Sequence, residues 1–305
     1  MFAVVGAIVM ATTGLGDEAA QVEPGHAQNS VYAGVLGEGL KANGAAVKLP
    51  GPRLRDGQSA EAQRTALREV AGSDQRLDEL VRKSVTAPYI IKVHDMKAGE
   101  ATIRVVDLWF VVYADIDEVD PASEAAKADE KGVEAGNMVL RTRLLKSEEI
   151  RAAGIAPPPG PERSGAGPMT WYAHIHGRLL DRIELDVTNQ VMATRTKESI
   201  LVAARTDPAF DKPGPYTNGW KPVGGDAAHD QDAAGGSRPY RGGISYTKIS
   251  RLAFQPGALL VEMHGAFVEP REWFQGAPIL RSKFSVVAQD QIRRLRRELE
   301  RKGGE

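Results

Sequence analysis

The 305-residue sequence predicts an α+β protein, with a curved, mainly antiparallel sheet, N-terminal helices and a long C-terminal amphipathic helix. Three observations predict this class. Segments rich in β-branched and aromatic residues recur between about residues 87 and 268. The stretch from Trp171 to Val187 alternates apolar and polar residues, which is typical of a half-buried strand. Residues 285–302 place an apolar stripe at helical spacing.

Composition and charge indicate a folded protein without a general affinity for polyanions. Hydrophobic residues make up 42% and charged residues 26%, which favours a packed core over global disorder. The formal net charge is -1, so we expect no nucleic-acid partner. The chain has no cysteine, which excludes disulfides, thiol nucleophiles and zinc–thiolate sites.

The first 16 residues, MFAVVGAIVMATTGLG, are apolar and uncharged and end in small residues. They predict a signal peptide cleaved near Gly16, and therefore export to the periplasm or the extracellular space. The alternative is a buried N-terminal strand or helix. Residues 17–58 mix Gly, Pro, Ala and charge without a period and predict a weakly ordered linker. Residues 59–305 then form a single α+β domain, in which no segment is long and apolar enough to span a membrane.

The first part of this domain predicts two helices and two strands. Residues 59–83 contain helix formers interrupted at Gly72, which indicates two short helices. Strands follow at 87–96 and 102–115, joined by a hairpin turn. The second strand is apolar on both faces and so belongs in the middle of a covered sheet. Asp107 lies within it, either as a carboxyl with a raised pKa in a pocket or as a structural aspartate bonded to the backbone.

The middle of the domain predicts further strands and long loops. The alternating stretch 171–187 is too long for one ordinary strand, so we expect a break near Gly177 or Asp181. The remaining elements are a strand at 137–146, a short helix at 147–154, strands at 190–195 and 199–205, and long loops at about 153–168 and 206–243.

The clearest local signals come last. Pro256 and Gly257 suit the central positions of a type II turn and predict a hairpin of residues 245–254 and 258–268. The C-terminal helix has an apolar stripe of Ala288, Ile292, Leu295 and Leu299, opposite an arginine-rich face that we expect to be solvated. This order of elements is similar to the helix-grip architecture of START-type lipid-binding domains; the similarity is one of element order, and no sequence motif carries it.

Histidines on strands suggest a possible metal site. His174 and His176 point to one side of their strand, and Glu262 and His264 do so on theirs. If these strands lay side by side, the four residues would form a zinc site with an open position for water, as a zinc-dependent hydrolase requires. The alternative interpretation is that His174 and His176 belong to the polar face of a half-buried strand.

Three other patterns are weaker. The quartet Ser245–Lys248 matches the S-x-x-K of serine acyl-transfer enzymes, but a strand sends the serine and the lysine to opposite faces. Asp226, Asp230 and Asp232 offer calcium ligands without the glycine and glutamate of an EF-hand. Nucleotide-binding loops and the G-x-S-x-G hydrolase motif are absent from the sequence.

Together these features lead us to expect an exported, soluble, non-catalytic protein without a cofactor. It would bind an apolar or amphipathic small ligand, or an envelope partner, between its sheet and its helix. The expected ligand contacts are Trp109, Asp107, Trp273 and Phe274, the last two from a loop that could cap a cavity. The alternatives are the zinc-dependent hydrolase and a structural envelope component. The sequence does not determine the oligomeric state.

Overall fold

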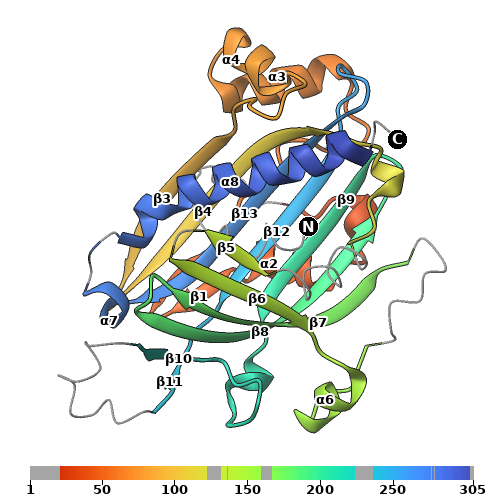
Figure 1. Ribbon diagram of the computed structural model, residues 1–305. Helices are drawn as coiled ribbons and strands as arrows, with labels where there is room; N and C mark the ends of the chain where they lie inside the picture. Colours follow the sequence, from red (N-terminus) through yellow and green to blue (C-terminus); the bar gives the residue numbers. More distant parts are fainter. Residues whose placement is uncertain are drawn as a thin grey trace.

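The computed structural model describes residues 21–121, 132–135, 137–158, 167–223, 236–275, 277 and 279–302. Within these ranges the protein is α+β, as the sequence predicts, and its main sheet has eleven strands (Figure 1). All pairings in the sheet are antiparallel, in the order β3-β4-β13-β12-β9-β8-β7-β6-β5, with β10 joined to β8 and β11 joined to β10. The strands are β3 (Ile90–Ala98), β4 (Ala101–Tyr113), β5 (Val133–Ala135), β6 (Met138–Leu144), β7 (Met169–Leu179), β8 (Ile183–Arg195), β9 (Ser199–Thr206), β10 (Gly219–Pro222), β11 (Arg238–Pro239), β12 (Gly243–Arg251) and β13 (Ala258–Pro270).

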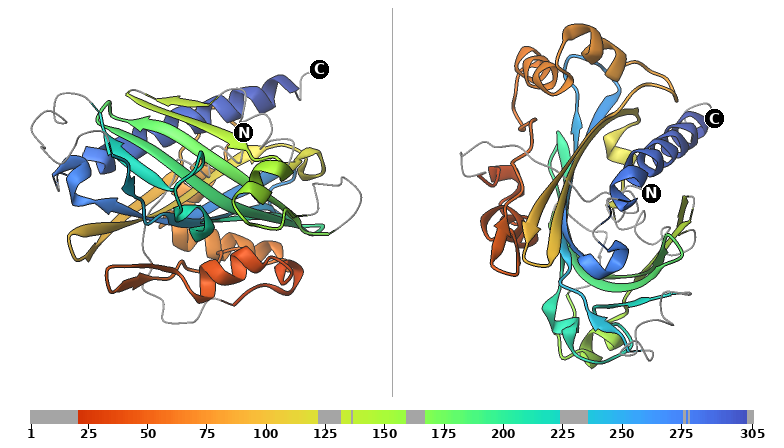
Figure 2. Two further views of the ribbon diagram at one scale, coloured as in Figure 1. Left: turned by 90° about the horizontal axis from the view of Figure 1, so that it is seen from below. Right: turned by 90° about the vertical axis from the view of Figure 1, so that its left-hand side faces the viewer.

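The sheet is strongly curved, and both of its faces are covered (Figure 2). Helices α7 (Arg271–Phe274) and α8 (Ile279–Lys302) lie on the concave face. Helix α2 (Ser30–Gly37) and the hairpin of β1 (Leu40–Ala42) and β2 (Ala45–Val47) lie on the convex face. Strand β4 therefore buries both of its faces: Val106, Leu108 and Phe110 pack under α8, while Ile103 and Val105 belong to the convex-face core formed with α2 and the β1–β2 hairpin.

The expectation of weak order over residues 17–58 is not met in the described part of that segment. Asn29 begins α2 by accepting a hydrogen bond from the Tyr32 amide, and the helix buries Val31, Tyr32, Val35 and Leu36 against the sheet. The hydrophobic periodicity of this eight-residue helix is weak, which explains why the sequence pattern does not reveal it. Tertiary packing, rather than local propensity, orders the segment.

The helices that the sequence predicts over residues 59–83, 147–154 and 285–302 are present. Ser59 begins α3 (Ala60–Ala71), Gly72 ends it with φ +87°, and Ser73 begins α4 (Asp74–Leu80). Helix α6 (Ser147–Ala152) follows β6. Helix α8 buries Ala288, Ile292 and Leu295 as predicted, and it begins at residue 279, six residues before the expected start. The short 3₁₀ helices are η1 (Pro24–His26), η2 (Ile116–Glu118) and η3 (Pro208–Asp211).

Two predicted turns are also present, and the structure shows which of the two positions proposed for the first turn is the correct one. The break in the alternating stretch falls at Leu180 and Asp181, whose φ angles are 52° and 56°. Gly177 instead lies inside β7, where a β-carbon would come within 2.5 Å of the Val139 carbonyl oxygen. In the later hairpin, Gly257 has φ 74°, and the Ala258 amide donates to the Gln255 carbonyl at 3.0 Å, as a type II turn requires.

Some predictions concern residues outside the described ranges. These are the signal peptide at 1–16, the acidic loop at 226–232 and part of each long loop. The described part of the second loop contains η3, β10 and β11. Among the described helices, none combines the length and the hydrophobicity needed to cross a membrane.

Candidate functional site

An apolar cavity lies between the concave face of the sheet and helices α7 and α8. Its volume is about 50 Å³. The sheet supplies most of the wall and the two helices close it; the lining residues are Met138, Leu140, Ile175, Leu179, Leu185, Val187, Asn189, Tyr240, Phe267, Trp273, Leu280 and Phe284.

The alternation that predicts β7 and β8 also builds this wall. Because successive side chains of a strand point to opposite faces, Ile175 and Leu179 of β7 face the cavity together with Leu185 and Val187 of β8. Their polar neighbours in sequence face the other side of the sheet. The cavity wall is thus a direct consequence of the period-two pattern.

Two aromatic residues of the lining carry buried polar atoms without a partner among the described residues. Tyr240 and Trp273 line the cavity and stack on each other, with ring centroids 5.5 Å apart and planes inclined by 18°. Each residue is 3% exposed. The Tyr240 hydroxyl and the Trp273 indole N–H are buried without a hydrogen-bond partner among the described residues. A buried polar group without a partner costs free energy, and the great majority in native proteins are paired.

Both groups act as hydrogen-bond donors in this setting. The indole N–H can only donate. Burial, and to a lesser extent the charge of Glu269, raise the pKa of Tyr240 well above its ordinary value, so its hydroxyl keeps its proton. Both residues line the cavity, whose wall is otherwise apolar apart from Asn189.

The predicted ligand contacts divide between the two faces of the sheet. Trp273 lines the concave cavity, and Phe274 is buried beside it, with ring centroids 6.4 Å apart. Trp109 and Asp107 project from the convex face of β4 and contact Glu262 and His264. The structure does not bring the four residues into one site, because the sheet lies between the two pairs. Tyr240 is not among the ligand contacts predicted from the sequence, because it lies in the polar stretch 206–243 that is predicted to be a loop.

On the convex face, Asp107 and Trp109 belong to a buried polar cluster. His264 is held between two carboxylates, with its Nδ1 2.5 Å from Asp107 Oδ1 and its Nε2 2.9 Å from Glu262 Oε1. The Trp109 indole N–H and the Arg53 amide also donate to Glu262. Burial alone would lower the pKa of His264, but Asp107 and Glu262 outweigh it and raise this pKa to about 9. Burial raises the pKa of Asp107.

A second buried ion pair lies on the neighbouring strand. Lys248 is 1% exposed, and its ammonium group donates to both carboxylate oxygens of Glu23 at 2.6 and 2.7 Å and to the Leu54 carbonyl at 2.9 Å. Asp56 lies 3.2 Å from the same ammonium group and accepts a hydrogen bond from Ser199. Glu23, Leu54 and Asp56 all belong to the N-terminal segment. The lysine of the predicted S-x-x-K match is therefore an anchor for that segment.

These two clusters hold the N-terminal segment on the sheet. Asp107, Glu262, His264 and Lys248 are each 1% exposed and bonded to one another or to that segment, so no substrate can reach them in this conformation. The four-residue zinc site is not formed. Strands β7 and β13 are separated by β8, β9 and β12, which places His174 and His176 about four strand spacings, or about 19 Å, from His264 and Glu262.

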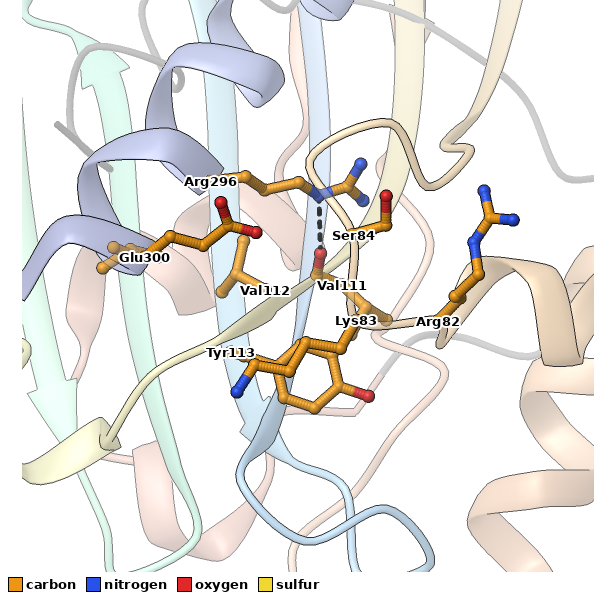
Figure 3. Close-up of a pocket in the computed structure, with 9 residues that line it drawn as sticks. Arg82, Lys83, Ser84, Val111, Val112, Tyr113, Arg296 and Glu300 are labelled. Carbon is orange, nitrogen blue, oxygen red and sulfur yellow. Dashed lines mark hydrogen bonds between the residues drawn. The ribbon is translucent and has the colours of Figure 1, made fainter. Parts of the chain in front are cut away.

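A polar pocket of about 350 Å³ lies where the C-terminal half of α8 meets β4 and the loop after α4 (Figure 3). Arg296 reaches into it from α8, and its Nε donates to the Val111 carbonyl at 3.0 Å. Its other nitrogens donate to the carbonyls of Val85, Ala87 and Pro88. Burial lowers the pKa of Arg296 to about 10, which leaves it protonated at neutral pH. Backbone carbonyls satisfy this cation, so the pocket is a structural junction.

No protein-family model matches the chain, and neither does any curated protein sequence. Function is therefore inferred from the chain's own residues.

Proposed function

We propose that the protein binds a small amphipathic ligand, without transforming it, in the cavity beneath α7 and α8. The observation that carries this proposal is a largely apolar cavity lined by Tyr240 and Trp273, whose hydroxyl and indole N–H are buried without a partner among the described residues. A ligand with an apolar body and a carbonyl or carboxylate oxygen would satisfy both donors. Binding would then recover the hydrogen bonds that the ligand-free protein lacks.

The composition of the wall supports binding rather than catalysis. Among the described residues that line the cavity, none is a carboxylate, histidine, lysine, serine or threonine, so Tyr240 is the one side chain there that could carry a proton. Asn189 adds one polar side chain, whose oxygen accepts a hydrogen bond from Thr206.

The size of the cavity limits the ligand. A volume of about 50 Å³ holds a few non-hydrogen atoms, whereas pockets for drug-sized ligands reach about 300–1,000 Å³. A short-chain carboxylic acid or a small ketone fits without change. A longer chain would have to widen the space between α8 and the sheet.

Substituting Tyr240→Phe tests the proposal with two opposite effects. Removing the unpaired hydroxyl should leave the ligand-free protein as stable as the wild type, or more stable by up to about 1–3 kcal/mol. The same change should weaken binding of short-chain carboxylates by about fivefold, since one hydrogen bond is lost. Chemical denaturation would give the free energy of unfolding, and tryptophan fluorescence titration with C2 to C4 carboxylates and with acetone would give the affinity.

Tyr246→Phe is the matched control. The Tyr246 hydroxyl donates to the Pro50 carbonyl at 2.6 Å, so its removal should destabilise the protein. The proposal would be overturned if the wild type bound no carboxylate or small ketone in the series, or if Tyr240→Phe destabilised the protein as much as Tyr246→Phe does.

A further inference from the structure

The polar face of β7 and β8, on the other side of the sheet from the cavity, gathers metal-ligating side chains. Strands β7 and β8 lie side by side in the sheet (Figure 1). Their register places His176 opposite Asp186. Glu184 lies two residues before Asp186 and so shares its face. One ligand atom from each of these three residues lies within 4.8 Å of the others.

His174 lies beside this group, 3.3 Å from Asp186, and its hydrogen bonds fix which nitrogen faces the carboxylate. The Thr188 hydroxyl donates its proton to the Tyr216 carbonyl at 2.9 Å. Thr188 Oγ1 can then only accept from His174 Nδ1, which lies 3.0 Å away, so Nδ1 carries a proton. In the neutral imidazole, His174 Nε2 is left with a lone pair.

That lone pair faces a carboxylate. His174 Nε2 lies 3.3 Å from Asp186 Oδ1, and the residue is 8% exposed, so little water reaches it. Two facing lone pairs repel each other unless a proton or a cation lies between them. A separation of 3.3 Å is long for a charge-assisted hydrogen bond, which is typically 2.7–2.9 Å. It equals the separation of about 3.3 Å between two ligands that each lie about 2.0–2.1 Å from a tetrahedral ion.

From this arrangement we infer a site for one divalent transition-metal ion, of the Zn²⁺ type, formed by His174, His176, Asp186 and Glu184. Two imidazoles and two carboxylates favour zinc or cobalt over calcium or magnesium, which prefer oxygen ligands alone. The bond from His174 Nδ1 to Thr188 is the outer-shell contact that orients ligating histidines in known metal sites. The inference is independent of ligand binding in the concave cavity.

Lys221 competes with the ion. Its ammonium group lies 2.6 Å from Glu184 Oε1, on the adjacent strand β10. A metal ion bound by Glu184 must displace the Lys221 ammonium group from this carboxylate. If the ion pair persists, the ion is held by the other three residues alone. Replacing Lys221 by a neutral residue should therefore tighten metal binding. The replacement would have no such effect if Glu184 were only the ion-pair partner of Lys221 and did not bind the metal.

The test is a titration of the full chain with Zn²⁺, followed by desalting and elemental analysis, with Co²⁺ absorption spectra as a second readout. We expect one equivalent of zinc in the wild type and at least a tenfold loss of affinity in Asp186→Asn and in His176→Gln. His94→Ala removes an exposed histidine on β3, far from the site, and should retain full affinity. Lys221→Gln should bind more tightly than the wild type. Circular dichroism would confirm that each variant is folded.

Long-range ¹H–¹⁵N spectra of the histidine rings provide a readout that stability alone would not affect. On addition of Zn²⁺, His174 Nε2 should shift as a metal-bound nitrogen while Nδ1 stays protonated. The inference is overturned if the wild type retains no more zinc than the Asp186→Asn, His176→Gln double variant, or if His174 binds through Nδ1.

Discussion

At the residue scale, the main lesson is that buried charges can be anchors rather than reactive groups. Lys248 and His264 are both shielded from water. Lys248 forms ion pairs with Glu23 and Asp56, and His264 forms ion pairs with Asp107 and Glu262. Asp107 illustrates the difficulty for sequence analysis. Its burial follows from its apolar neighbours, but its partner His264 lies 157 residues away, so no local pattern identifies it.

Removing the ammonium group of Lys248 should destabilise the protein strongly. In Lys248→Met, the carboxylate of Glu23 stays buried without its cation, and breaking a buried ion pair in this way typically costs about 3–5 kcal/mol. Lys197→Met, at an exposed position, should change the free energy of unfolding by less than about 0.5 kcal/mol. Urea denaturation of both variants would measure the difference. Equal stability of the two variants would contradict the anchoring role of Lys248.

At the scale of elements, the existence of α8 and the burial of its apolar stripe are predicted correctly. The prediction that its arginine-rich face is solvated is wrong at one residue, Arg296. The stripe of Ala288, Ile292 and Leu295 is buried as the spacing indicates. The arginine-rich face was expected to be solvated, but Arg296 is 5% exposed and donates to four backbone carbonyls. Arg296 thereby joins α8 to β4 and to residues 85–88.

Substituting Arg296→Met should loosen this junction locally. The carbonyls of Val85, Ala87 and Pro88 would lose their donor, so amides in residues 82–88 and in the C-terminal half of α8 should exchange hydrogen faster. The matched control is Arg297→Met, one position further along the helix and exposed. Hydrogen–deuterium exchange by mass spectrometry would compare the two. Identical exchange in both variants would show that the guanidinium does not hold the junction.

At the scale of the whole molecule, the polar clusters on the convex face make stability depend on pH in two opposite directions. Burial, with the nearby Lys248, lowers the pKa of His26 to about 4, below the ordinary value of about 6.5. Between these values the unfolded chain binds a proton that the folded chain does not, so stability falls as pH drops from about 6.5 to 4. His264 behaves in the reverse sense, since its pKa is about 9 in the folded protein.

The expected result is a stability maximum near pH 6.5. Above it, the folded protein holds a proton on His264 that the unfolded chain has released, so stability is lost as pH rises towards 9, by up to about 1.4 kcal/mol per pH unit. Urea denaturation from pH 4 to 9 would show both limbs. His264→Gln should flatten the alkaline limb and His26→Gln the acid limb. A stability profile of the wild type that rises steadily up to pH 9 would contradict this assignment.

Local sequence patterns predict the α+β class, the two helices at residues 60–80, the hairpins and the C-terminal helix correctly. They can do so because alternation, helical spacing and turn residues act within about ten positions of the chain. Three features follow only from the three-dimensional fold: residues 22–58 cover the convex face, His264 contacts Asp107, and Tyr240 stacks on Trp273 beside the cavity. Those contacts join segments far apart in sequence, and they depend on the order of the strands in the sheet, which local periodicity does not encode.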